Sequence, residues 1–153
     1  MRDRRHDVFT VFVVVVILAA TFGLFVLKPW RAGIEVVVED SVDASAVVTA
    51  AGDWEGHNGY SVQGVVELTG STVRLLHFSA EPTPDPRVVL YSESGAVDLG
   101  ALRGTEGQLV YELPAGALPS AYDAVALEDR AIGAAIARAS LVPAEPVDAA
   151  EPG

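Results

Sequence analysis

The stretch SVQGVVELTGSTVRLLHF, from Ser61 to Phe78, decides the fold class of this chain. It holds two runs rich in valine, leucine and threonine, Ser61–Leu68 and Thr72–Phe78, separated by Thr69-Gly70-Ser71. Side chains branched at the β-carbon favour extended backbone, whereas a short segment of small polar residues and glycine favours a turn. The pattern predicts two consecutive β-strands separated by a turn.

The same texture of short apolar runs and turn residues continues toward the C-terminus. Further strands are predicted at Arg87–Tyr91, Ala96–Leu99, Gln108–Leu113, Ala124–Leu127 and Arg138–Val142. The turn segments between them are Pro82–Pro86, Ser94-Gly95, Gly104–Gly107 and Pro114–Pro119. Regularly spaced short strands favour an all-β fold, an antiparallel β-sandwich or a barrel, and we expect the sandwich. Ala131–Ala139 (AIGAAIARA) disagrees with this pattern, because its composition favours a helix.

An uninterrupted apolar run lies near the N-terminus. Val8–Leu27 holds 20 residues without a charge, 15 of them Val, Ile, Leu or Phe, between Asp7 and Lys28. As a helix it would span about 30 Å, the thickness of the hydrocarbon core of a bilayer. We therefore expect a single transmembrane helix. Trp30, just beyond it, suits the membrane interface.

Two alternatives to this anchor are weaker. A helix that packs on the core of a domain keeps one polar face in solvent, and 20 consecutive apolar residues leave no such face. A cleaved signal peptide would have a shorter apolar region ending in a small-x-small site, whereas the end of this run, Gly23–Lys28, is bulky. The short N-terminal tail and the long acidic remainder favour an N-terminus inside and a C-terminal domain outside the cell membrane.

These features divide the chain into five expected parts. They are a cytoplasmic N-terminus (1–7), the transmembrane helix (8–27), a membrane-proximal linker (28–51), the β-sandwich domain (52–142) and a disordered acidic tail (143–153). Within the linker, Ile34–Glu39 looks extended, and Ser41–Ala51 fits a short helix or a stalk.

Charge and cysteine content exclude several kinds of function. From Ala32 onward, 19 carboxylates face five arginines and no lysine, a net charge of −14. Such a surface repels phosphate backbones, so nucleic acid is not an expected partner. The chain has no cysteine, which excludes disulfides, thiolate metal sites and thiol nucleophiles.

Seven segments occur in an order and spacing found in a known family. They are Gly52-Asp53-Trp54, Ser61–Val66, Val73–Phe78, Pro84–Leu90, Val97–Gly104 with Gly107, Tyr111 and Pro114, Tyr122–Leu127, and Ala139–Leu141. In this order they resemble the DM-thirteen domain, a small β-sandwich grouped with DOMON-type electron-transfer modules. Lys28-Pro29-Trp30-Arg31 is similar to the membrane-proximal segment of actinobacterial members.

The resemblance implies an electron-transfer role, but this chain lacks the cysteine on which that role depends in the family. The family's proposed redox role rests on a cysteine, and the spacing places Asp129 at its position. A carboxylate forms neither a thiyl radical nor a disulfide. If the family moves electrons through that cysteine, this chain does not.

The other candidate residues in the sequence give weaker support for a functional site. His57 and His77 are weak candidate metal ligands, with Asp53, Glu55 and Asp129 as conceivable additional ones, and we expect neither a metal nor a cofactor. There is no Gly-x-Ser-x-Gly motif. The four aromatic residues Trp54, Phe78, Tyr91 and Tyr111 are expected in the core, although an exposed Trp54 would offer a platform for a ligand.

The sequence therefore favours a membrane-anchored, extracytoplasmic binding or structural module without catalytic activity. Its expected partners are the lipid bilayer, through the N-terminal helix, and an envelope protein or small ligand that the sequence does not identify. An electron-transfer module, or one that binds a cofactor or metal, is the alternative. A hydrolase would require the fold to bring a serine and histidine, or two carboxylates, together.

Overall fold

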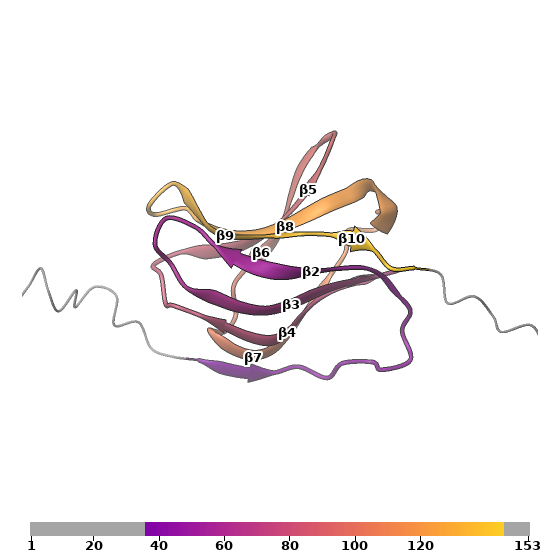
Figure 1. Cartoon of the computed structure of the whole chain (residues 1–153), viewed down its shortest axis with the longest axis horizontal. Coiled ribbons are helices and arrows are strands. Elements are labelled where there is room, and N and C mark those ends of the chain that lie inside the picture. Colours follow the sequence, from indigo (N-terminus) through magenta and orange to yellow (C-terminus); the bar gives the residue numbers. More distant parts are fainter. Residues whose placement is uncertain (1–35, 146–153) are drawn as a thin grey trace, which may run out of the picture. The chain divides into compact units, whose positions relative to one another are not determined.

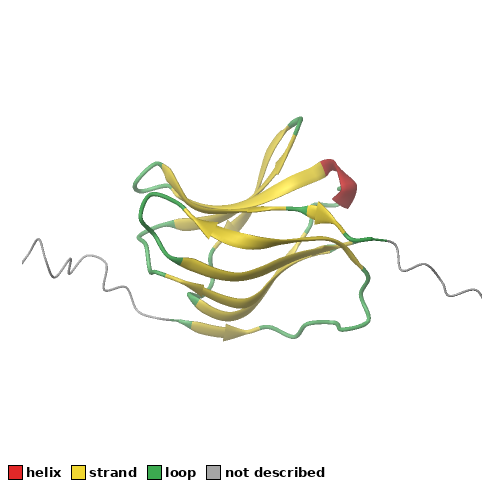
Figure 2. Cartoon of the chain, viewed as in Figure 1, coloured by secondary structure: helices red, strands yellow, loops and turns green. Residues whose placement is uncertain are grey.

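The computed structural model describes residues 36–145, and within them the fold is all-β. The elements are β1 (Val37–Glu39), β2 (Val48–Gly56), β3 (Val62–Thr69), β4 (Thr72–Ala80), β5 (Pro86–Ser92), β6 (Gly95–Ala101), β7 (Glu106–Glu112), the short 3-10 helix η2 (Pro119–Ala121), β8 (Tyr122–Asp129), β9 (Ala134–Ser140) and β10 (Val142–Pro143). The predicted all-β class is thereby confirmed for this part of the chain (Figure 2).

The expected anchor Val8–Leu27, Trp30 at its border, and the tail beyond residue 145 lie outside the described residues. Within residues 36–145, no helix is both long and apolar enough to cross a membrane.

The strands form one curled sheet in the order β1-β7-β4-β3-β2-β9-β8-β5-β6, with β10 added beside β2 (Figure 1). The two halves are continuous because β2 belongs to both: Val48–Asp53 pairs with β3, and Trp54–Gly56 pairs with β9. All pairings are antiparallel except that of β1 with β7, which is parallel. The sheet is therefore mixed, which corrects the expectation of a purely antiparallel arrangement.

One apolar core is enclosed by both halves of the sheet. Alternate side chains along each strand point into it, as the two-residue period of a strand requires. The core includes Val66, Leu68, Val73, Leu75, Phe78 and Leu109 from β3, β4 and β7, and Val88, Leu90, Val125, Leu127, Ala137 and Ala139 from β5, β8 and β9. Burial of this cluster holds together strands that are distant in the sequence.

The helical propensity of Ala131–Ala139 is overridden in the fold. Arg130–Gly133 forms a turn, with Gly133 at a φ of 63°, and β9 follows it as a strand paired with β2 and β8. Ala137 and Ala139 are fully buried against the core. This burial and the hydrogen bonds to two neighbouring strands outweigh the intrinsic preference of alanine for a helix.

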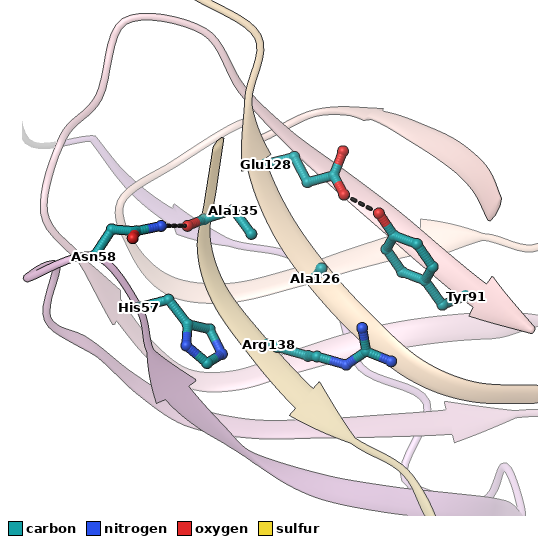
Figure 3. Close-up of a pocket in the computed structure, with 7 residues that line it drawn as sticks. All are labelled: His57, Asn58, Tyr91, Ala126, Glu128, Ala135 and Arg138. Atoms are coloured by element: carbon teal, nitrogen blue, oxygen red, sulfur yellow. Dashed lines mark hydrogen bonds between the residues drawn. The ribbon is translucent and has the colours of Figure 1, made fainter. Parts of the chain in front are cut away.

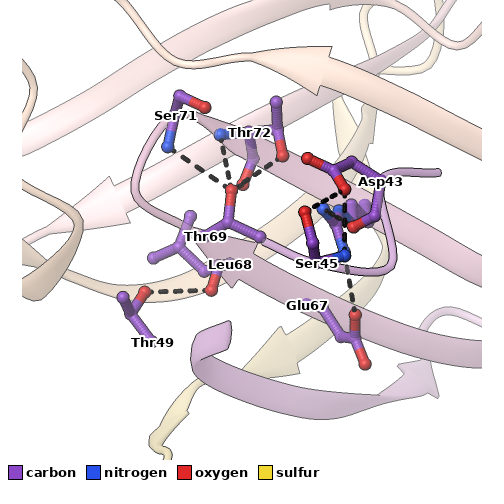
Figure 4. A network of polar contacts seen from close by, with 9 residues as sticks. Asp43, Ser45, Thr49, Glu67, Leu68, Thr69, Ser71 and Thr72 are labelled. Carbon is purple, nitrogen blue, oxygen red and sulfur yellow. Dashed lines mark hydrogen bonds and ion pairs between the residues drawn. The ribbon is translucent and has the colours of Figure 1, made fainter. Parts of the chain in front are cut away.

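The described part of the range 28–51, expected as a linker, belongs to the fold. Its extended segment includes β1, and Val48 begins β2, so neither a helix nor a free stalk precedes the domain there. Between them, Asp43 accepts hydrogen bonds from the backbone N–H (2.9 Å) and hydroxyl (2.6 Å) of Ser45. The buried Arg74 of β4 donates to the carbonyl of Asp43 at 2.6 Å and fixes this loop on the sheet. Figure 4 shows Asp43 and Ser45 beside the strands that carry Glu67 and Thr72.

Strand β1 is fixed to the sheet edge by an ion pair. Asp40, just after β1, pairs with Arg103, and it accepts a hydrogen bond from the backbone N–H of Val110 at 2.8 Å. Arg103 in turn donates to the carbonyl of Val110 at 2.6 Å and lies 5.0 Å from the ring centroid of Tyr111. Gly107 permits the close approach of the two strands, because a β-carbon there would collide with the carbonyl oxygen of Val38.

Replacing Asp40 with alanine should lower the free energy of unfolding by about 1–2 kcal/mol, the usual worth of charge-assisted hydrogen bonds that are partly exposed. The Arg103 hydrogen bond and then the Val110 N–H hold the pKa of Asp40 below its ordinary value. The stabilisation is therefore present above about pH 4 and is lost as the pH falls through the lowered pKa of the folded state.

Urea denaturation of the full chain in detergent, at about pH 7 and about pH 3, tests this expectation. Glu39→Ala, at the exposed carboxylate that ends β1 next to Asp40, is the matched control and should have little effect. An equal loss for Asp40→Ala at both pH values would contradict the assigned role of the ion pair.

Candidate functional site

A cleft of about 290 Å³ opens on the outer surface of β5, β8 and β9 (Figure 3). Its lining combines one cationic, one imidazole, one carboxylate and one phenol side chain with a small apolar floor. The lining residues are His57, Asn58, Tyr91, Ala126, Glu128, Ala135 and Arg138.

The floor of the cleft follows from the alternation of β8. Val125 and Leu127 point into the core, so Ala124 and Ala126 point outward. These two alanines are only 1% and 2% exposed, because larger side chains on the neighbouring strands rise around them. A small residue between large ones leaves a hollow in the outer face of the sheet.

The carboxylate side of the cleft is fixed by a hydrogen bond. The hydroxyl of Tyr91, on β5, donates to Oε1 of Glu128, on β8. This bond, followed by burial and the charge of Glu128, raises the pKa of Tyr91, because loss of the phenol proton would place two negative charges side by side. Tyr91 therefore acts as a donor that orients Glu128.

The basic side of the cleft comes from β9 and from the turn after β2. Arg138 is paired with Ala126 across the strands, and its guanidinium carbon lies 5.1 Å from the ring centroid of Tyr91. The backbone N–H of His57 donates to the carbonyl of Ile136 at 2.8 Å. Asn58, with a φ of 54°, donates from Nδ2 to the carbonyl of Ala135 at 2.8 Å, so the turn that carries the imidazole is tied to β9.

Arg138 makes the longest ion pair of the arginines among the described residues. The others are held by short contacts: Arg74 by the carbonyl of Asp43, Arg103 by Asp40, and Arg87 and Arg130 by Asp98. The ion pair of Arg138 with Asp123 is 4.0 Å long, and the Asp123 side chain is 61% exposed. An exposed pair at this distance contributes little, so the guanidinium is free to turn toward a ligand.

The structure separates the candidate metal ligands of the sequence. His57 lies in the cleft, whereas His77 lies on β4 in the other half of the sheet. Asp53 and Glu55 flank a different hollow on β2. Across residues 36–145, no group of three or more histidine, cysteine, aspartate or glutamate side chains is placed to hold a metal ion.

His77 has a structural role at a β-bulge. Its φ of 48° is unusual for a residue with a side chain, and it faces Gly64, with a φ of 117°, where β3 and β4 change register. A β-carbon at Gly64 would lie 2.7 Å from the carbonyl oxygen of Leu76. The bulge therefore depends on this glycine, and His77 is exposed beside it.

Asp129, the residue that the sequence resemblance aligns with a cysteine, is the last residue of β8 and is buried, with 1% of its surface exposed. Its Oδ1 accepts hydrogen bonds from the backbone N–H groups of Ala131 (2.8 Å) and Ile132 (3.1 Å), and its Oδ2 accepts one from that of Asp85 (3.0 Å). Burial alone would raise the pKa of Asp129, but these donors hold it below its ordinary value. Its oxygens are thus engaged in joining two loops.

The four aromatic residues expected in the core divide into two groups. Trp54, Phe78 and Tyr111 are buried, so Trp54 is not an exposed platform for a ligand. Tyr91 is instead on the outer face and lines the cleft. The alternation of β5, in which Val88 and Leu90 point inward, carries the signal that would have placed Tyr91 outside.

Replacing Glu128 with alanine should lower the pKa of Tyr91 toward the ordinary value of about 10 for tyrosine. In the native protein the raised pKa means that this tyrosine stabilises the fold below its unfolded-state pKa, and that the contribution is lost as the pH rises through the folded-state value. Ultraviolet titration of phenolate absorbance, with Tyr91→Phe to identify the signal, measures the shift. An unchanged titration in Glu128→Ala would contradict the hydrogen bond as its cause.

Comparison with family models, with characterised proteins and with solved structures gave no match to this chain.

Proposed function

We propose that this chain is a membrane-anchored, extracytoplasmic binding module, and that the cleft over β5, β8 and β9 is its ligand site. The observation that carries the proposal is the cleft itself, in which Arg138, His57 and Glu128 surround an apolar floor (Figure 3). A concave site with a few convergent polar groups is typical of small-molecule binding.

The chemistry of the cleft favours binding over catalysis. Tyr91, the hydroxyl that faces the site, has a raised pKa and gives its proton to a hydrogen bond with Glu128. A nucleophile would need the opposite, a lowered pKa or an unoccupied base beside it. The polar groups of the cleft are arranged to orient a ligand.

The anchored, extracytoplasmic location rests on the sequence. Val8–Leu27 has the length and composition of a membrane-spanning helix, and the region after it carries a net charge of −14. We propose that the DM-thirteen resemblance extends to a β-sandwich held outside the membrane. Protease treatment of intact cells should digest the C-terminal domain and leave the membrane-embedded fragment; protection of the domain would contradict this orientation.

The binding function is tested on the full chain in detergent micelles. A panel of amino acids, sugars and organic acids is added singly, and amide NMR shifts are followed at Ala126 and Ala135. We expect at least one class to shift these resonances in a saturable way, and expect Arg138→Gln to weaken that binding. If no compound shifts them, the cleft is not a small-molecule site and the proposal fails.

The electron-transfer alternative rests on the resemblance alone. Asp129, at the position of the family cysteine, is engaged by three backbone N–H groups. An ultraviolet-visible spectrum and metal analysis of the purified full chain distinguish the two functions. A stoichiometric chromophore or metal would favour the alternative and overturn the proposal made above.

A further inference from the structure

The two charged sides of the cleft do not neutralise each other. Glu128 is hydrogen-bonded to Tyr91, and Arg138 lies over the Tyr91 ring and reaches toward Asp123. Among the ion pairs of residues 36–145, none joins Glu128 to Arg138, although both line the same cleft. The site therefore offers a cation and an anion that are each available to a third group.

The strand register sets how far apart the two charged residues are attached to the sheet. Arg138 is paired with Ala126 on β8, and Glu128 lies two residues farther along the same strand and face. Arg138 and Glu128 are therefore diagonal neighbours on adjacent strands, and such residues lie about 7–8 Å apart. Across this distance, over the alanine floor, a small molecule can place one charged group at each end (Figure 3).

The groups at each end determine which charge the ligand carries there. A guanidinium binds a carboxylate through two parallel hydrogen bonds, and the imidazole of His57 can add a third donor. At the other end the carboxylate of Glu128, oriented by the Tyr91 hydroxyl, accepts a charge-assisted hydrogen bond from an ammonium group. The strongly negative domain repels a simple anion, so a carboxylate is favoured when the same molecule also carries a positive charge.

We propose that the cleft binds a small zwitterion, a molecule such as a free amino acid that carries a carboxylate and an ammonium group. The carboxylate contacts Arg138 and His57, the ammonium contacts Glu128, and the alkyl part lies on Ala126 and Ala135. The volume of about 290 Å³ accommodates one such molecule. The inference rests on the proposed binding function and names its ligand class.

The test compares whole ligands with their two halves, using the full chain in detergent micelles. Each common L-amino acid is titrated singly, and the dissociation constant is taken from the shifts at Ala126 and Ala135. The best ligand is then compared with its decarboxylated amine and its deaminated acid. We expect each half to bind at least about tenfold more weakly, since each loses one charge-assisted contact.

Three variants assign the contacts. Arg138→Gln should weaken binding of the amino acid at least about tenfold and leave binding of its decarboxylated amine unchanged. Glu128→Gln should also weaken binding of the amino acid at least about tenfold, but it should leave binding of the deaminated acid unchanged. Arg130→Gln is the matched control for net charge, because Arg130 is held by Asp98 and does not line the cleft; it should change nothing.

The outcomes separate this inference from the proposed function. If a neutral sugar or a plain carboxylate binds the cleft as tightly as any amino acid, the zwitterion inference is overturned and the binding module stands. If Arg130→Gln weakens binding as much as Arg138→Gln, the recognition is by net charge and the assigned contacts are wrong. If no compound binds, both proposals fail.

Discussion

Replacing Trp54 with alanine should lower the free energy of unfolding by about 3–5 kcal/mol, the usual cost of removing a large buried aromatic side chain. Trp54 is 7% exposed and meets Phe78 edge to face, with ring centroids 6.1 Å apart. It also lies where β2 passes from its pairing with β3 to its pairing with β9. A cavity there weakens the connection between the two halves of the sheet.

Trp54→Phe is the informative companion variant. The Nε1 of Trp54 is buried without a hydrogen-bond partner, so phenylalanine removes an unsatisfied donor while keeping an aromatic ring. We expect a loss of about 1–2 kcal/mol, since the smaller ring leaves a smaller cavity. Urea denaturation followed by circular dichroism avoids the fluorescence of Trp30. If Trp54→Phe lowered the free energy of unfolding as much as Trp54→Ala, the aromatic ring at this position would not be the source of the stability.

Replacing Asp129 with alanine should cost about 2–4 kcal/mol, because three backbone N–H groups lose a buried, charged acceptor at once. The lowered pKa of Asp129 sets the pH window of this effect. Its contribution is present above the unfolded-state pKa of about 3.9 and is lost as the pH falls through the lower folded-state value. The difference between the native protein and the variant should therefore narrow in acid.

Two further substitutions at Asp129 show what the position requires. Asp129→Asn keeps one acceptor oxygen, so it should lower the stability less than Asp129→Ala does. Asp129→Cys offers only a weak acceptor, so it should lower the stability nearly as much as Asp129→Ala. Thermal denaturation of the three variants gives the order directly. Full stability of Asp129→Cys would mean that the turn between β8 and β9 does not depend on the carboxylate.

Much of the fold is readable from local pattern. The predicted strands Ser61–Leu68 and Thr72–Phe78 correspond to β3 (Val62–Thr69) and β4 (Thr72–Ala80), because their apolar periods and the turn between them agree. Local pattern does not predict the first part of β9, because its alanines favour a helix in isolation. They become extended only through burial and pairing with two partner strands. The parallel pairing of β1 with β7 joins residues about 70 positions apart, which no local pattern indicates.

The cleft could not be read from the sequence as a unit. Its lining comes from the turn after β2 and from β5, β8 and β9, and the register that brings Arg138 opposite Ala126 depends on the whole sheet. His57 is only a weak candidate metal ligand in the sequence, and the structure places it in the same cleft as Arg138 and Tyr91. Aromatic character suggested that Tyr91 is buried, whereas the period of its strand points it outward.

The parallel pairing of β1 also determines how the domain resists force. A pull along β1 from its N-terminal side stretches its contacts with β7 together, so they must fail in shear and not one after another. These contacts include the bonds of Val36 with Thr105 and the bond from the Asp40 N–H to the carbonyl of Gln108. The ion pair of Asp40 with Arg103, at the far end of the strand, is loaded together with them and adds to this resistance. Tension that enters through β1 would thus reach the sheet at β7, which β4, β3 and β2 separate from the cleft on β5, β8 and β9.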